Sequence, residues 1–273
     1  MRLQTVPARQ GATWVREGMR TFFMRPFAFS AMTGVVIFGL LLVKLLPVLA
    51  IVVLPLTPLV TLGFMIAARS VRDGGSPTLR VFVDPLRAPR PRVVALLQLG
   101  LVYAVATFAI MWFGDLFGGD GSEVLREAVP AAAGAASAPP TIAISSDAAF
   151  SMLLQFALAG LLSVPFWHAP ALVYWDGHGC AKALFSSTLA CWRNRGAFFV
   201  YGAVWFGCVM ALSLVVGLFV ALLGQPQWLM VASAPLSLVM ASLFYPSLYF
   251  TFADCFVASD PAGSSPTPTE ERS

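Results

Sequence analysis

The longest feature of the hydrophobic pattern is an apolar stretch, Pro26–Ala68, that carries one charge, Lys44. A single helix of these 43 residues would be about 65 Å long, roughly twice the hydrocarbon core of a bilayer. Divided at Lys44, the stretch leaves 18 residues before the lysine and 24 after it, and each part can cross once. Pro47 disfavours a helix that continues through this point. The pattern therefore predicts a hairpin of two spans, 27–43 and 46–68.

Lys44 is predicted to lie at the tip of this hairpin. There its ammonium group can reach water, whereas a lysine at the bilayer centre would cost at least about 3 kcal/mol. The alternative interpretation is an intramembrane lysine with a function of its own.

Four further apolar runs bring the total to six spans. They cover 93–113, 149–175, 197–223 and 228–253. The chain is thus predicted to be an all-α polytopic membrane protein, with one integral membrane domain over 1–257 and six transmembrane helices arranged as three hairpins. An outer loop, 114–147, contains the low-complexity run "VPAAAGAASAPPTIAISS", and the tail 258–273 is predicted to be disordered and cytosolic.

The composition agrees with a membrane location. Hydrophobic residues make up 58% of the chain and charged residues only 11%, whereas soluble domains carry about 25% charged residues. The mean hydropathy is +0.81. The arginines flank apolar runs and form no separate basic domain, which argues against nucleic acid as a partner. The four cysteines lie in segments predicted to be cytosolic or intramembrane, so no disulfide framework is expected.

The distribution of basic residues predicts the orientation of the chain. With a cytosolic N-terminus, 15 of the 17 lysines and arginines fall on the cytosolic side, and only Lys44 and Arg126 fall outside. Basic residues in short loops favour the cytosolic side, so both termini are predicted to be cytosolic. The first span is expected to remain in the mature protein, because no cleavage site of small residues follows a short apolar core.

Each hairpin is preceded by a segment whose apolar residues recur at helical spacing. These segments read "TWVREGMRTFFMRPFAF", "TLRVFVDPLRAPRPRV" and "KALFSSTLACWRNRGAFF". They predict a unit that is used three times: a cytosolic amphipathic helix at the membrane interface, followed by a transmembrane hairpin. Pro85 limits the second of these helices. The alternative is that basic amphipathic flanks occur here without any repeat.

Aromatic and basic residues in these segments are predicted to anchor them at the interface. Aromatic rings favour the headgroup level, and each basic side chain near an anionic leaflet gains about 1 kcal/mol. The expected partners are therefore the lipid bilayer and the anionic phospholipids of its cytosolic face. The predicted anchoring residues are Trp14, Phe22, Phe23, Trp192, Arg16, Arg20, Arg25 and Arg195.

Two ionisable residues are candidates for a function within the membrane. His168 lies between Pro165 and Pro170 in the fourth span, where prolines can break the helix and free carbonyl groups. Asp254 lies at the cytosolic exit of the sixth span. Ionisable residues in spans often mark functional sites. The alternative for His168 is a neutral histidine that is hydrogen-bonded to a freed carbonyl.

No catalytic, cofactor or metal site is predicted. The sequence contains no G-x-S-x-G or H-E-x-x-H motif, and "RDGGSP" lacks the lysine of a phosphate-binding loop. His178, Cys180 and Cys191 match no zinc-binding spacing.

Small residues recur four apart in the last two spans, as at Ala203, Gly207 and Ala211. This spacing lets helix backbones approach closely. It predicts tight packing within the chain or, alternatively, a homo-oligomer face.

Three stretches carry a resemblance to a known family. They are "LQTVPARQGATWVREGMRTFFMRPFAF", "TLGFMIAARSVRDGGSP" and "WHAPALVYWDGHGCAKALFSSTLACWRNRGAFFVYGAVW". In these stretches the chain resembles an uncharacterised proteobacterial family of six-helix inner-membrane proteins of the Burkholderia type. More loosely, it is similar to YciC-type membrane proteins. The resemblance implies a bacterial inner-membrane location and the six-helix fold, and it implies no catalytic residue.

The expected function is that of a non-enzymatic integral membrane protein with a structural or accessory role in the cell envelope. The alternative is a transporter or channel for a small solute or lipid-related molecule, which would use His168 and Asp254. A membrane-protein partner and a homo-oligomer are both left open.

Overall fold

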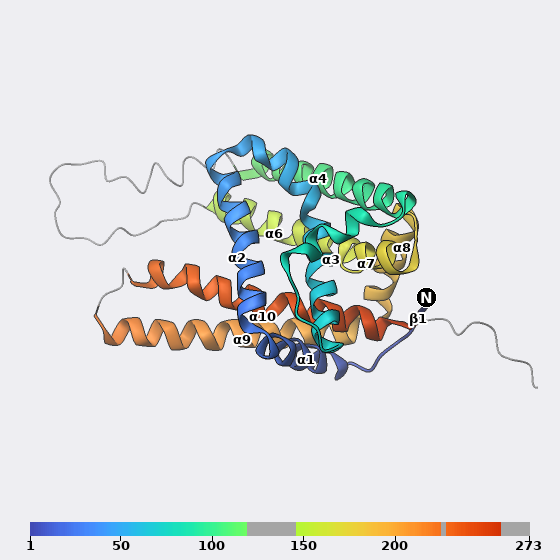
Figure 1. Cartoon of the computed structure of the whole chain (residues 1–273). Helices are drawn as coiled ribbons and strands as arrows, with labels where there is room; N and C mark the ends of the chain where they lie inside the picture. Colours follow the sequence, from blue (N-terminus) through green and yellow to red (C-terminus); the bar gives the residue numbers. More distant parts are fainter. Residues whose placement is uncertain (119–145, 225–227, 258–273) are drawn as a thin grey trace, which may run out of the picture.

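The computed structural model describes residues 1–118, 146–224 and 228–257 (Figure 1). Six helices in this part of the chain are long and apolar enough to cross a membrane, which confirms the predicted all-α membrane class. Most of the predicted outer loop, 114–147, and the predicted tail, 258–273, lie outside the described residues. The candidate spans are Pro26–Val43, Pro47–Arg72, Arg90–Gly114, Ala149–Asp176, Arg195–Leu222 and Val231–Cys255.

The elements follow one another in the order in which the hydrophobic pattern places them. The helices are α1 (Gln10–Met24), α2 (Pro26–Leu45), α3 (Ala50–Arg72), α4 (Arg90–Gly118), α6 (Ser146–Phe166), α7 (Ala169–Asp176), α8 (Cys180–Arg193), α9 (Arg195–Leu222) and α10 (Trp228–Cys255). Three short 3-10 helices are η1 (Pro47–Leu49), η2 (Leu79–Phe82) and η3 (Asp84–Arg87), and two short strands are β1 (Arg2–Leu3) and β2 (Phe256–Val257).

The first two spans separate directly after Lys44. This residue lies in the last turn of α2, which ends at Leu45. Leu46 then leaves helical geometry, with φ −131° and ψ 84°, and Pro47 opens η1. Proline has no N–H to donate and disfavours helical geometry at the residue before it. The helix therefore breaks at the predicted point.

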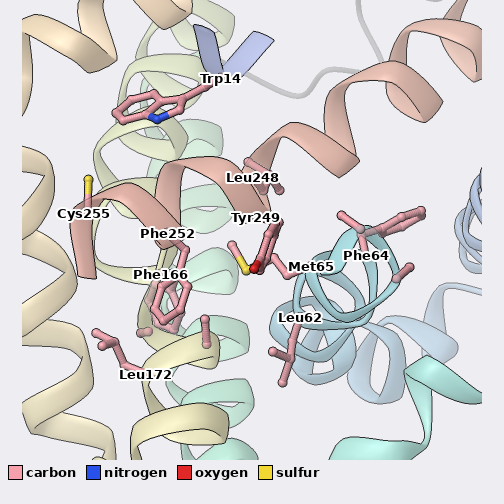
Figure 2. Close-up of a cluster of buried hydrophobic side chains, with 14 of the residues drawn as sticks. Trp14, Leu62, Phe64, Met65, Phe166, Leu172, Leu248, Tyr249, Phe252 and Cys255 are labelled. Atoms are coloured by element: carbon pink, nitrogen blue, oxygen red, sulfur yellow. The ribbon is translucent and has the colours of Figure 1, made fainter. Parts of the chain in front are cut away.

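The hydrophobic core lies at the end of the bundle where β1, near the N-terminus, pairs with β2. Its buried side chains come mainly from α1, α7 and the parts of α3 and α10 at this end (Figure 2). Phe64 of α3 stacks on Tyr245 of α10, with the ring centroids 4.2 Å apart. At the opposite end, many large apolar side chains of α2, α6 and α9 are exposed. Such side chains suit contact with acyl chains, because lipid tails are as apolar as leucine.

Helix α1 is a member of the bundle and not only a lead into the first span. It packs extensively on both α9 and α10, and these two consecutive helices contact each other less than each contacts α1. The other large helix contacts join α3 to α4 and α10, and α4 to α6. The last two spans are therefore joined largely through α1.

The segment before the third span differs from the predicted amphipathic helix. Residues 79–87 form the two short 3-10 helices η2 and η3. Pro85 lies in this segment, and its ring and missing N–H disfavour one continuous α-helix. The prediction of three equivalent helical units is therefore wrong at the second unit.

The small residues of α9 do not form a packed seam within the described part of the chain. Ala203, Gly207 and Ala211 are exposed. No described atom outside the helix's own backbone lies within 4 Å of a Cβ placed at Gly207. The predicted close packing within the chain is wrong for this ladder, because its residues lie on the face of α9 opposite to the core residues Tyr201 and Trp205. The homo-oligomer face stays a prediction.

Candidate functional site

His168 lies at a break in the fourth span, between the end of α6 and the start of α7. Its side chain is completely buried. Its Nε2 atom lies 3.2 Å from the hydroxyl oxygen of Thr251, which in turn donates a hydrogen bond to the carbonyl of Leu248 at 2.8 Å. Because the threonine proton is used in this way, Nε2 of the imidazole carries the proton and donates it. Trp167 Nε1 donates to the same hydroxyl oxygen, at 3.2 Å.

The break has an identifiable cause, the hydroxyl group of Ser187 on α8. In a continuous helix the N–H of His168 would donate to the carbonyl of Val164. Here that N–H donates to the Ser187 hydroxyl at 3.0 Å, and the hydroxyl donates to the Val164 carbonyl at 3.1 Å. A side chain inserted into the helical ladder in this way bends the helix. The predicted break near Pro165 and Pro170 is present, and α8 is bound to it.

Asp254 is held by two donors from α1. Gln10 Nε2 donates to its Oδ2 atom at 2.6 Å, and Trp14 Nε1 donates to the same oxygen at 2.8 Å. Hydrogen bonds to a charged group are stronger than neutral ones. Asp254 therefore connects the end of α10 to α1, at the end of the sixth span where the sequence places it.

Asn194 connects the N-terminal segment to the same region. Its side-chain oxygen accepts a hydrogen bond from the N–H of Val6 at 2.8 Å, and its amide nitrogen donates to the carbonyl of Gln4 at 3.1 Å. The amide nitrogen also contacts the Cys255 sulfur at 3.4 Å. One buried asparagine thus joins the N-terminal segment, the α8–α9 junction and the end of α10.

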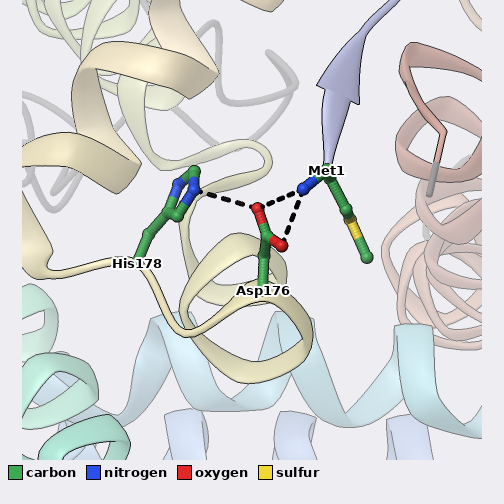
Figure 3. Close-up of polar contacts among 3 residues, drawn as sticks. All are labelled: Met1, Asp176 and His178. Atoms are coloured by element: carbon green, nitrogen blue, oxygen red, sulfur yellow. Dashed lines mark hydrogen bonds and ion pairs between the residues drawn. The ribbon is translucent and has the colours of Figure 1, made fainter. Parts of the chain in front are cut away.

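A second contact holds the N-terminus at the end of α7 (Figure 3). The amino group of Met1 lies 2.8 Å from both carboxylate oxygens of Asp176, and His178 Nε2 lies 2.9 Å from Oδ2. Desolvation, with a contribution from Lys182, lowers the pKa of His178 despite the opposing effect of Asp176. β1 pairs antiparallel with β2 beside this contact, with Arg2 opposite Val257.

The predicted anchoring residues divide into two groups. Trp14 is fully buried and Phe22 is 8% exposed, because α9 and α10 cover this face of α1. The prediction that these two side chains anchor in lipid is therefore wrong. Phe23 and Trp192 are each 69% exposed. The predicted anchoring arginines, which are Arg16, Arg20, Arg25 and Arg195, are also exposed.

The third segment, α8, presents a bulky face outward and a small face inward. Phe185 and Trp192 are exposed on it, whereas Ala183, Ser187 and Ala190 are buried. Small side chains let α8 approach α6 and α7 closely enough for Ser187 to enter the break.

The side chains of His178, Cys180 and Cys191 do not come together at one site. In the described part of the chain, no group of three histidine, cysteine or acidic side chains has the geometry to hold a metal ion. Cys180 and Cys191 lie near opposite ends of α8. Burial raises the pKa of Cys191 to about 12, so this thiol stays protonated.

Two adjoining cavities lie between the spans. One, of about 170 Å³, is lined by Thr57, Thr61, Ser163 and Trp167, among other residues. The other, of about 300 Å³, lies farther along α4 and α6. Tyr103 lines both of them. Together they form a crevice that approaches the break in the fourth span.

Trp167 also lines a larger groove of about 510 Å³. It is bounded by α6, α8, α9 and α10. Arg195 lines it at the start of α9, and the rest of the lining is mainly aromatic and apolar.

The comparison with known proteins identifies the relatives of the chain. A probable inner membrane protein of Burkholderia thailandensis is 32% identical over 274 aligned positions, which cover the full length of both proteins. The chain belongs to this inner-membrane family. The predicted resemblance is thereby confirmed, and with six candidate spans the protein is a multi-pass protein of the inner membrane. The looser likeness to YciC-type proteins stays a prediction. No protein-family model and no solved structure matches the chain.

Sequence reasoning identified His168 and Asp254 but missed their partners. Thr251 and Ser187 are single hydroxyl residues in apolar helices, and no spacing distinguishes them from other such residues. The amphipathic pattern does not separate the two places in which an indole is found, because an indole suits both an interface and a core with a hydrogen-bond acceptor.

Proposed function

We propose that this inner-membrane protein has a non-enzymatic, structural or accessory role in the cell envelope. The observation that carries the proposal is the set of hydrogen bonds by which the candidate polar residues connect different helices. Asp254 accepts hydrogen bonds from Gln10 and Trp14, and Ser187 occupies the gap in the helix beside His168. These groups join separate helices to one another, which favours a scaffold that holds a fixed surface for another membrane component.

The second candidate is a transporter for a small solute or a lipid-related molecule. It is favoured by the crevice that runs past Tyr103 to Trp167, next to the break in the fourth span. Nδ1 of His168 is buried without a hydrogen-bond partner, and such an atom can accept a proton or a ligand.

His168→Ala separates the two candidates. Under the structural role, the variant is expected to lose about 1–3 kcal/mol of stability, because the Thr251 hydroxyl loses a buried partner. Thermal unfolding of the detergent-solubilised protein and its abundance in the membrane measure this loss. A variant with normal abundance and normal unfolding that still fails to complement a deletion strain would favour the transporter. Thr188→Ala, which changes an exposed hydroxyl on α8, is the matched control.

We also propose that both termini face the cytosol. The support is the concentration of 15 of the 17 basic residues on the side of the termini, as the positive-inside rule requires. The exposed Arg16 and Arg20 of α1, and Arg25 directly before α2, would then face the anionic phospholipids of the inner leaflet.

Reporter fusions test this orientation. An enzyme that is active only outside the cytosol is expected to be active after Lys44, Gly134 or Gln225. It is expected to be inactive after Asp73, Gly179 or Ser273, and a cytosol-active reporter should give the reverse pattern. Activity of the first reporter at any site of the second set would contradict the proposed orientation.

A further inference from the structure

The groove bounded by α6, α8, α9 and α10 lies partly at the level of the membrane spans, where its walls can contact lipid. Its walls include Val164 of α6 and Phe199 and Trp205 of α9, all within candidate membrane spans. Its volume of about 510 Å³ lies within the range of roughly 300–1,000 Å³ that is usual for ligand sites. In a bilayer such a groove is in contact with acyl chains and not with bulk water.

The lining of the groove suits a hydrocarbon chain. Trp167, Phe198, Trp205 and Phe244 form much of its aromatic surface. The Trp167 ring meets both Phe198 and Phe244 edge-on, with centroids 5.7 and 6.3 Å apart, so these walls are packed against one another. A rigid apolar groove accepts an acyl chain without paying to order its own side chains.

One end of the groove carries a positive charge. The Arg195 guanidinium lies over the Trp192 ring, 5.8 Å from its centroid. Among the ion pairs of the described residues, none involves Arg195. The positive end of the α9 dipole lies at the same place. A guanidinium held in this way can bind a phosphate through two parallel hydrogen bonds.

We propose that this groove binds one anionic phospholipid, with an acyl chain against Trp205 and Phe244 and the headgroup phosphate at Arg195. The site goes beyond the structural role proposed above. One lipid would occupy a defined position on the protein. This binding would add to the general attraction between the basic residues and the anionic lipids of the inner leaflet.

Two glycines of α9 provide a matched test of the groove. Gly202 lines it, whereas Gly207 does not. Both are exposed, and nothing lies within 4 Å of a Cβ built at either position. The first carbon of a side chain therefore meets no neighbour at either position, and only Gly202→Phe adds its ring to the lining of the groove.

The experiment uses the full chain in detergent micelles that contain equal amounts of phosphatidylglycerol and phosphatidylcholine with the same acyl chains. Native mass spectrometry then counts the lipids that remain bound. The wild-type protein and Gly207→Phe are expected to retain one phosphatidylglycerol, and Gly202→Phe is expected to lose it. Millimolar inorganic phosphate should leave the retention unchanged, because the acyl chain is part of the ligand.

The charge is tested separately. Arg195→Gln is expected to lower the ratio of retained phosphatidylglycerol to phosphatidylcholine about fivefold, and Arg193→Gln, at an exposed neighbouring arginine, to leave it unchanged. Equal lipid retention by Gly202→Phe and Gly207→Phe would overturn the proposed groove site. An unchanged ratio in Arg195→Gln would overturn the proposed headgroup contact, and this variant decides the matter if Gly202→Phe does not fold.

Discussion

Replacing Gly11 and Gly18 together with alanine is expected to release α1 from the bundle. A Cβ at Gly11 would overlap the carbonyl of Ala197, and a Cβ at Gly18 would overlap Ser247. The Gly11 overlap involves α9 backbone, and the Gly18 overlap includes backbone atoms of α10, so neither neighbour can move aside as a flexible side chain would. Overpacking typically costs about 1–3 kcal/mol for each site, so the double variant should lose several kcal/mol.

Trypsin and thermal unfolding measure this release. In the wild-type protein α1 is docked, and cleavage after the exposed Arg16 and Arg20 should be slow. The double variant should be cleaved there rapidly and should unfold at a lower temperature. Gly207→Ala is the control, because alanine has the higher helix propensity by about 1 kcal/mol and its Cβ meets no neighbour. If the double variant were as stable as this control, the close contact of α1 with α9 and α10 would be wrong.

The second large effect is expected from Asp254→Leu. The substitution removes the acceptor of both Gln10 and Trp14, and it leaves the fully buried indole N–H without a partner. Hydrogen bonds to a charged group contribute about 1.5–3 kcal/mol each, so a loss of about 3–6 kcal/mol is expected for the two bonds. Thermal unfolding should show the loss, and α1 should become sensitive to trypsin.

Asp254→Asn is the matched variant for this test. Its side-chain oxygen can still accept the Trp14 hydrogen bond, so it should retain much of the stability that Asp254→Leu loses. If Asp254 served transport alone, both variants would unfold like the wild-type protein and both would lose flux. Equal stability of all three proteins would therefore contradict the structural role of this carboxylate.

The two predictions concern one region, the end of the bundle where α1, the α6–α7 break and the N-terminal segment meet. Here the protein uses buried polar groups to position helices, as with Asn194 and Ser187. The other end presents apolar side chains that can face lipid. A bundle packed mainly at one end is consistent with the proposed scaffold, because the rigid part lies on the side that also carries the exposed basic residues.

The amino-acid sequence by itself determined the number and approximate position of the six spans. Length and apolarity are local properties, and a bilayer requires about 20 apolar residues for each crossing helix. The turn after Lys44 follows from the same length and from Pro47. None of these features depends on which helices become neighbours.

Only the tertiary structure decided which residues complete each polar site and which face of α1 is buried. Glycine adds no apolar side chain to a periodic pattern, so the sequence does not mark Gly11 and Gly18 as contact points. The structure shows that Gly11 contacts α9 and Gly18 contacts α10. Trp14 lies in the core and not at the predicted lipid interface, and there Asp254, 240 residues later in the chain, accepts a hydrogen bond from its indole N–H. Ser187 bends a helix to which it does not belong. Such pairings depend on the distances between helices, and spacing along one chain does not contain them.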